Sequence, residues 1–226
     1  MLFVLLLLAF IAIILLPQFW VKRVIAKHAG HRADFPGTGG ELATHLIEHY
    51  DLKGVGVERT QMGDHYDPDS RTVRLSDQNY DGASLSAVAI AAHEVGHALQ
   101  HRRGDGMLSL RQRLAKTMIW TDRIGSVFFL VSPLLAVLTK APGLFLLTVA
   151  VGLIMMGMRV VVQLVTLPME FDASFKKALP ILKEGGYLAD KDLPAARQVL
   201  KAAALTYVAA ALMSLLDMAR WIRVLR

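Results

Sequence analysis

The first twenty residues of the chain, MLFVLLLLAFIAIILLPQFW, contain no charged side chain. An uncharged apolar run of this length can cross a lipid bilayer as a helix, because about 20 apolar residues span the hydrocarbon core. A cleaved signal peptide would begin with basic residues and end at a small-residue cleavage site. No basic residue precedes this run, and bulky residues with Pro17 close it. We therefore interpret residues 1–20 as a retained membrane anchor.

Further apolar runs follow later in the chain. Residues 124–138 and 144–167 are separated by TKAPG and predict a transmembrane hairpin. An Ala-rich stretch at residues 201–216 either crosses the membrane or packs along the other helices. The chain is 54% hydrophobic and only 19% charged, which is less charge than a soluble domain of this length carries. We therefore expect about four apolar or transmembrane helices.

The placement of Lys and Arg indicates the kind of partner, and the lack of Cys limits the residues that could bind a metal. The net charge is +6, and Lys and Arg follow the membrane segments instead of forming one stripe. This pattern is typical of membrane topology, so we expect the lipid bilayer as a partner and no nucleic acid. The chain contains no Cys, which excludes disulfides and thiolate ligands. A metal would have to be held by His, Asp or Glu.

The segments outside the membrane runs predict a small α+β part. Apolar and His positions three and four apart predict a helix at residues 38–50. Residues 55–57 and 72–75 (TVRL) predict two short strands, with the turn GDHYDPDS between them. Caps in DGAS precede a helix over SLSAVAIAAHEVGHALQHRRG, which should be buried because it is apolar on nearly every face up to His93.

The sequence HEVGH at residues 93–97 lies inside this helix. Residues i and i+4 of a helix are about 40° apart around its axis, so His93 and His97 can present two imidazoles to one ion. Glu94 is turned by about 100°, near the ion but outside the ligand pair. This is the geometry of a zinc hydrolase, in which the metal lowers the pKa of a water and a glutamate takes its proton.

A catalytic zinc needs a third protein ligand and an open position for water. Glu170 follows the second arm of the predicted hairpin, in LPMEFDAS. If the two arms leave and re-enter through the membrane, Glu170 emerges on the side that carries His93 and His97. We therefore expect Glu170 as the third ligand and one Zn²⁺ per chain. A structural reading of Glu170 is a favourable acidic residue just after Pro168 near a helix start.

Nearly the whole chain resembles the YugP-type neutral zinc metallopeptidases of bacterial membranes. The resemblance rests on five stretches, namely DHYDP at 64–68, VRLS at 73–76, AAHEVGHALQH at 91–101, QLVTLPMEFDAS at 163–174 and KAAALTYVAAAL at 201–212. The chain is more distantly similar to HtpX and the CaaX-prenyl proteases, which are gluzincins. The resemblance implies a mainly α, membrane-integrated zincin with a gluzincin-like α+β core and a small sheet. It also implies His93, His97 and Glu170 as ligands and Glu94 as general base.

One position departs from the HtpX pattern. There an aspartate follows the ligand glutamate by four residues, whereas here that place is Ser174 and the aspartate is Asp172. Metal-bound histidines need a second hydrogen-bond partner, and both residues are candidates for that role. His65, Tyr66 and Tyr207 are candidates to bind substrate or to donate to an oxyanion, although we favour a structural role for each. TVRL is either an edge strand that pairs with substrate or a structural strand.

These predictions divide the chain into six parts. They are an anchor at 1–20, a linker at 21–36, a catalytic part at 37–123, a transmembrane hairpin at 124–167, a second catalytic part at 168–200, and a C-terminal apolar helix with a basic tail at 201–226. The expected function is a membrane-bound zinc endopeptidase that hydrolyses a protein or peptide substrate. A zinc-stabilised membrane scaffold without catalysis is the alternative, and it would need the metal but not Glu94.

Basic residues also predict the orientation in a bacterial cell membrane. Lys22, Arg23, Lys27 and Arg32 follow the anchor, and Arg111, Arg113, Lys116 and Arg123 precede the hairpin. The loop between the hairpin arms has only Lys140. Since cytoplasmic loops carry the excess of Lys and Arg, the active site should face the cytoplasm. The basic tail at 219–226 would conflict with this rule if residues 201–216 cross the membrane completely.

Overall fold

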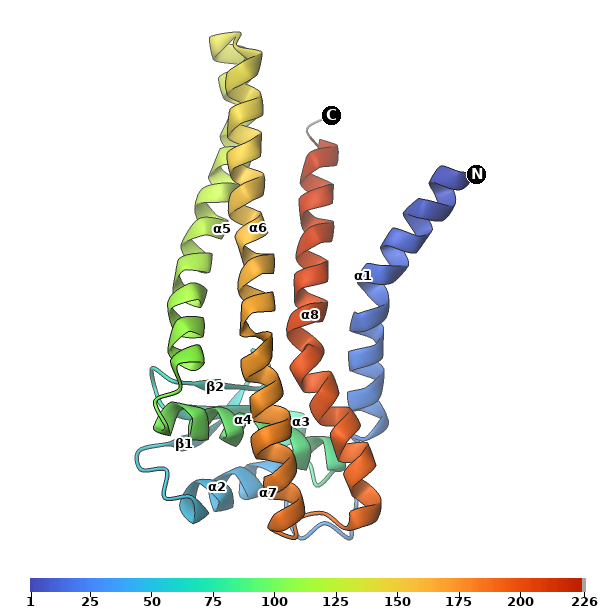
Figure 1. The fold of residues 1–226 in the computed structure, drawn as a ribbon, viewed down its shortest axis with the longest axis vertical. Coiled ribbons are helices and arrows are strands. Elements are labelled where there is room, and N and C mark those ends of the chain that lie inside the picture. Colours follow the sequence, from blue (N-terminus) through green and yellow to red (C-terminus); the bar gives the residue numbers. More distant parts are fainter. Residues whose placement is uncertain (225–226) are drawn as a thin grey trace. The chain divides into compact units, whose positions relative to one another are not determined.

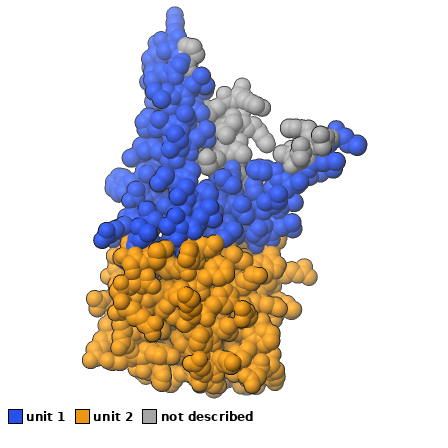
Figure 2. All heavy atoms as spheres, in the orientation of Figure 1, with its two compact units in different colours: residues 1–18, 110–166, 207–226 blue, residues 19–109, 167–206 orange. Residues whose placement is uncertain are grey.

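A computed structural model describes the backbone of residues 1–224 and the side chains of these residues except 2–4, 6–7, 122, 129, 142, 156, 159 and 216–224. The side chains of the predicted basic tail at 219–226 therefore lie outside the description. The chain divides into two compact units, which Figure 2 colours separately. One contains residues 1–18, 110–166 and 207–226, and the other contains residues 19–109 and 167–206.

The first unit is built from long apolar helices. It contains most of α5 (Gly106–Thr139) and α6 (Pro142–Phe171), together with the outer parts of α1 (Leu2–Lys27) and α8 (Leu193–Val224). These four helices are long and apolar enough to cross a membrane. Large apolar side chains on them are exposed, such as Leu130 (76%), Val137 (74%) and Ile154 (68%). Exposed apolar surface of this kind marks a membrane-facing region, so the predicted set of about four membrane helices is confirmed.

The predicted hairpin is present, but its first helix is longer than the apolar run. Lys140 and Ala141 connect α5 to α6, and Figure 1 shows the chain reversing direction there. The basic stretch before residue 124 belongs to α5 as well, because RQRLAK consists of strong helix formers without Gly or Pro. Similarly, the predicted helix at 201–216 is part of the longer α8.

The second unit begins its folded core with two capped helices. Thr38 and Glu41 form a capping box at the start of α2 (Gly39–His49), each side chain bonding the other residue's backbone N–H. The Ser84 hydroxyl accepts from the Ala87 N–H at the start of α4 (Leu85–Arg102). α4 lies at the centre of this unit and contacts α2, the sheet, and the segment after α6 (Figure 1). This explains why its sequence is apolar on almost every face.

A mixed three-stranded sheet has the order β1-β3-β2, with β1 (Gly56–Thr60), β2 (His65–Asp67) and β3 (Thr72–Ser76). β3 is parallel to β1 and antiparallel to β2, and the short α3 (Asp77–Tyr80) follows it. The TVRL segment is therefore the central strand, and the hypothesis that it is a substrate-binding edge strand is wrong. The sequence also missed β2, which was predicted as a turn. β2 is only three residues long and buries only Tyr66, so it has no visible alternation.

The segment after α6 continues as helix but changes its winding. A π-helix at Asp172–Ala178 leads into α7 (Leu179–Glu184), which ends before Gly185 and Gly186 as predicted. A 3₁₀ turn at Asp190–Asp192 then precedes α8. π-helical turns are rare and often occur at functional sites. This one begins two residues after Glu170.

Candidate metal centre

α4 supplies two of the three site residues. His93 and His97 are 3% and 2% exposed, and their ring centroids lie 4.7 Å apart. Their four-residue spacing places both rings on one face of the helix. Buried imidazoles are costly unless their nitrogens have partners. The surroundings of the four ring nitrogens therefore define what the site can bind.

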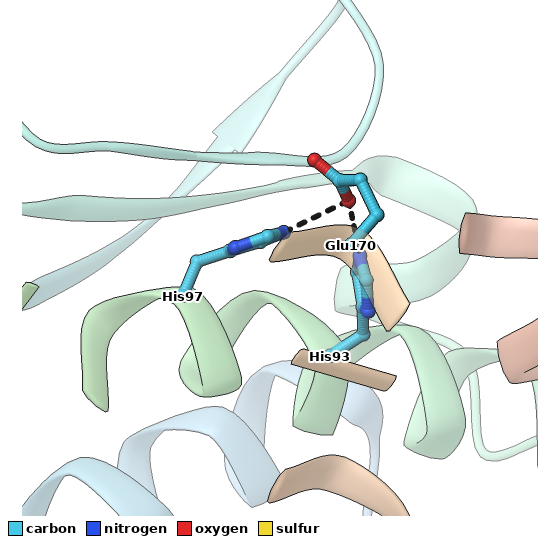
Figure 3. Close-up of side chains that lie close together, drawn as sticks. All are labelled: His93, His97 and Glu170. Atoms are coloured by element: carbon cyan, nitrogen blue, oxygen red, sulfur yellow. Dashed lines mark hydrogen bonds and ion pairs between the residues drawn. The ribbon is translucent and has the colours of Figure 1, made fainter. Parts of the chain in front are cut away.

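The end of α6 supplies the third residue. The carboxylate of Glu170 is fully buried, and its Oε2 lies 3.3 Å from His93 Nε2 and 3.2 Å from His97 Nε2 (Figure 3). One ligand atom from each of the three residues lies within 4.8 Å of the other two. The structure thus brings together His93, His97 and Glu170, which are 77 residues apart from first to last.

The Nδ1 atom of His93 faces Ser174, whose hydroxyl can only accept a hydrogen bond from it. Ser174 Oγ lies 3.0 Å from His93 Nδ1 and donates its hydroxyl hydrogen to the carbonyl oxygen of Leu200, also at 3.0 Å. A hydroxyl has a single hydrogen, so Ser174 accepts the other hydrogen bond. His93 therefore carries a proton on Nδ1.

His97 is fixed in the same way by Gln100. The Oε1 of Gln100 lies 2.8 Å from His97 Nδ1, while its Nε2 donates to the carbonyl oxygen of Met169 at 3.0 Å and to Asp172 Oδ2 at 2.8 Å. A carbonyl and a carboxylate only accept, so the amide cannot be turned around without losing both bonds. His97 therefore donates to Gln100 from Nδ1.

Because both Nδ1 atoms are bonded elsewhere, Nε2 is the ring atom of each histidine that faces the carboxylate of Glu170. Two imidazole nitrogens and a carboxylate oxygen therefore meet at 3.2 to 3.3 Å, a separation at which one cation can contact all three. Two imidazoles and a carboxylate suit zinc, and three protein ligands leave an open position, as in catalytic zinc sites. The donor set, the orientation of the rings and the burial all fit a zinc ion.

A glycine lets the two ligand-bearing segments approach closely. A Cβ placed on Gly96 would lie 3.0 Å from the carbonyl oxygen of Ala173 and 3.5 Å from Lys177 Cβ. Gly96 thus allows α4 to lie directly against the π-helix that follows Glu170. This gives the glycine in HEVGH a packing role between the two histidines.

The structure also places the other predicted site residues. Glu94 is on α4 and is 6% exposed. Ser174 contacts His93 directly, whereas Asp172 reaches His97 only through Gln100. Sequence reasoning missed Gln100. Its position three residues after His97, on the same helix face, was the available signal.

The three oxyanion candidates have different surroundings. The Nδ1 of His65 lies 2.8 Å from the carbonyl oxygen of Gly63. Tyr66 is buried with its hydroxyl 2.8 Å from His101 Nδ1, and burial raises the pKa of Tyr66 to about 12. Tyr207 belongs to the other compact unit, where Arg111 contacts its hydroxyl. The roles of all three residues in binding substrate or an oxyanion stay predictions.

β2 is fixed to its neighbour by an ion pair close to Tyr66. Asp67 Oδ2 accepts from Arg74 Nη1 at 2.6 Å. Although burial acts to raise the pKa of Asp67, hydrogen bonds from Arg74 and Ser70 lower it to about 2. The carboxylate is therefore ionised at neutral pH and holds the edge strand β2 against β3.

A buried His, His and Glu group on helices, in a chain with four helices that can cross a membrane, defines a class of helical membrane metalloprotein. Residues 3–226 match the family described as "Putative neutral zinc metallopeptidase", and the chain belongs to this family. It is 38% identical over 226 residues to "Putative membrane protease YugP" of Bacillus subtilis (strain 168), which covers 99% of this chain and 96% of that relative. No solved structure matches the chain. The predicted family resemblance is confirmed.

Proposed function

We propose that the protein is a membrane-integrated zinc endopeptidase. The observation that supports this most directly is the convergence of the Nε2 atoms of His93 and His97 on the buried Glu170 carboxylate, with both Nδ1 atoms bonded elsewhere. The name of the Bacillus subtilis relative points to the same activity.

A zinc ion held by these three residues would acidify water and polarise a peptide carbonyl. Glu94 takes the proton of the attacking water on its carboxylate and passes it to the leaving amine. His93 and His97 keep their Nδ1 protons throughout, because these N–H groups donate hydrogen bonds to Ser174 and Gln100. Burial of the group excludes bulk water, which strengthens the electrostatic interactions on which this chemistry depends.

The alternative is a zinc-stabilised membrane scaffold that does not catalyse a reaction. It requires His93, His97 and Glu170 but gives Glu94 no role. A comparison of membrane proteomes containing the wild type or Glu94→Gln separates the two. An endopeptidase would leave substrates intact only in the variant, whereas a scaffold would leave the two proteomes the same.

A further inference from the structure

Gln100 lies at the centre of a chain of hydrogen bonds that connects His97 to the π-helix. It is fully buried, although it carries a polar amide. Its Oε1 faces His97 Nδ1, and its Nε2 donates to Met169 and Asp172. The two contacts of its Nε2 join α4 to the segment that carries Glu170. The amide therefore acts between the two parts of the metal site.

Asp172 is in turn held by a buried lysine. Lys177 is 8% exposed and pairs with Asp172 Oδ2, the oxygen that accepts from Gln100. The neighbouring Lys176 has an 80% exposed side chain, and its Nζ lies 4.0 Å from Asp172 Oδ1. A buried ammonium group is costly without a partner. Asp172 is this partner for Lys177, and the ion pair also fixes the oxygen that accepts from the buried Gln100 amide.

We propose that Lys177, Asp172 and Gln100 form a relay that positions His97 as a metal ligand. The charge of Lys177 holds Asp172, Asp172 fixes the orientation of the Gln100 amide, and Gln100 accepts the Nδ1 hydrogen of His97. The Nε2 atom of His97 is thereby kept toward Glu170. Gln100 is a positioning residue, and the proposal rests on the proposed zinc function.

The relay has a direct consequence for how the site forms. The segment that supplies Glu170 also supplies Asp172 and Lys177, so docking of the π-helix on α4 both adds the third ligand and sets the ring of the second. The π-helix begins at Asp172, between Glu170 and Ser174, which bonds the other histidine. One seven-residue segment therefore orients both ligand histidines.

A charge swap tests the relay on the full chain. Gln100→Glu places two carboxylates side by side and removes the donor to Met169, so we expect zinc affinity to fall by about 10- to 100-fold, as for other partners of metal ligands. In Gln100→Glu combined with Asp172→Asn, the new glutamate still accepts from His97. The asparagine amide takes the place of Asp172 Oδ2 and donates to the glutamate, so that a single carboxylate again remains near Lys177. The double variant should recover at least about 10-fold of the lost affinity. Zinc affinity is measured by competition with a chelator.

The two adjacent lysines provide a matched control. Lys177→Met should lower zinc affinity about 10-fold because Asp172 loses its buried partner, whereas Lys176→Met should leave it unchanged. Thermal unfolding of each zinc-free variant shows whether it folds. A double variant that binds zinc no better than Gln100→Glu, or a Lys177→Met that matches Lys176→Met, would overturn the relay while wild-type zinc binding still supports the proposed function. Failure of the wild type to bind zinc would overturn both.

Discussion

At the scale of single residues, the two histidines depend on partners that water cannot replace. His93 and His97 are buried, and each has one acceptor for its Nδ1 hydrogen, Ser174 or Gln100. Loss of such an acceptor leaves a buried N–H group unpaired, which costs about 1–3 kcal/mol. The partners therefore contribute to the free energy of folding as well as to metal binding.

A substitution of Glu94, the proposed general base, tests the catalytic role of a single residue. Glu94→Gln keeps the size of the side chain and removes its ability to take a proton, so peptidase turnover should fall by at least about 100-fold. Zinc content should stay that of the wild type, because Glu94 is not among the three ligands. The exposed Glu184→Gln on α7 is the control and should leave both quantities unchanged. Equal loss of zinc and activity in Glu94→Gln would instead indicate a structural site.

Individual residues also show how far the sequence can be interpreted. The helical spacing of HEVGH identifies His93, Glu94 and His97 directly, because positions i and i+4 share a helix face. Glu170 required a topological argument about the hairpin. Gln100 was missed because a glutamine has many ordinary roles, and its value here depends on Asp172 and Met169, which are about 70 residues away in the sequence.

At the scale of elements, the close contact of α4 with the π-helix sets the position of Glu170. Gly96→Ala would place its Cβ 3.0 Å from a backbone oxygen of Ala173, so the two elements must separate slightly. Overpacking of this kind costs about 1–3 kcal/mol. We expect lower thermal stability and weaker zinc binding, measured on the purified protein.

Gly106→Ala is the matched control for this prediction. A Cβ at Gly106, which begins α5, would meet no atom within 4 Å. This variant should keep the stability and zinc affinity of the wild type. If Gly96→Ala behaves like the control, the close approach of α4 to the π-helix is not required for the site.

The elements differ in how well the sequence predicts them. Helix α2 was predicted from its periodicity and α4 from its caps and apolar faces, and these signals agree with the burial of both helices. Strand β2 was not predicted. A polar strand of three residues forms only through its pairing with β3 and the Asp67–Arg74 ion pair, which the local sequence does not reveal. The π-helix was also missed, since its composition is that of an ordinary helix and only the packing on α4 distinguishes it.

At the scale of the whole molecule, the orientation in the membrane is a prediction of its own. The excess of Lys and Arg around the anchor and before the hairpin predicts that the metal site faces the cytoplasm. The chain has no native Cys, so single cysteines can be introduced without background. Ser70→Cys in the turn between β2 and β3 should react with an impermeant thiol reagent only after lysis. Lys140→Cys in the hairpin loop should react on intact cells. The reverse pattern would place the site outside.

The most direct test of the central claim is a zinc measurement on the purified wild type and on Glu170→Ala. A mononuclear site of His93, His97 and Glu170 predicts about one zinc per wild-type chain. Glu170→Ala should lose the zinc at low free metal concentration, since two imidazoles alone make an incomplete site. Glu184→Ala, an exposed glutamate on α7, serves as the control and should retain it. Full zinc occupancy in Glu170→Ala would contradict the assignment of the metal centre.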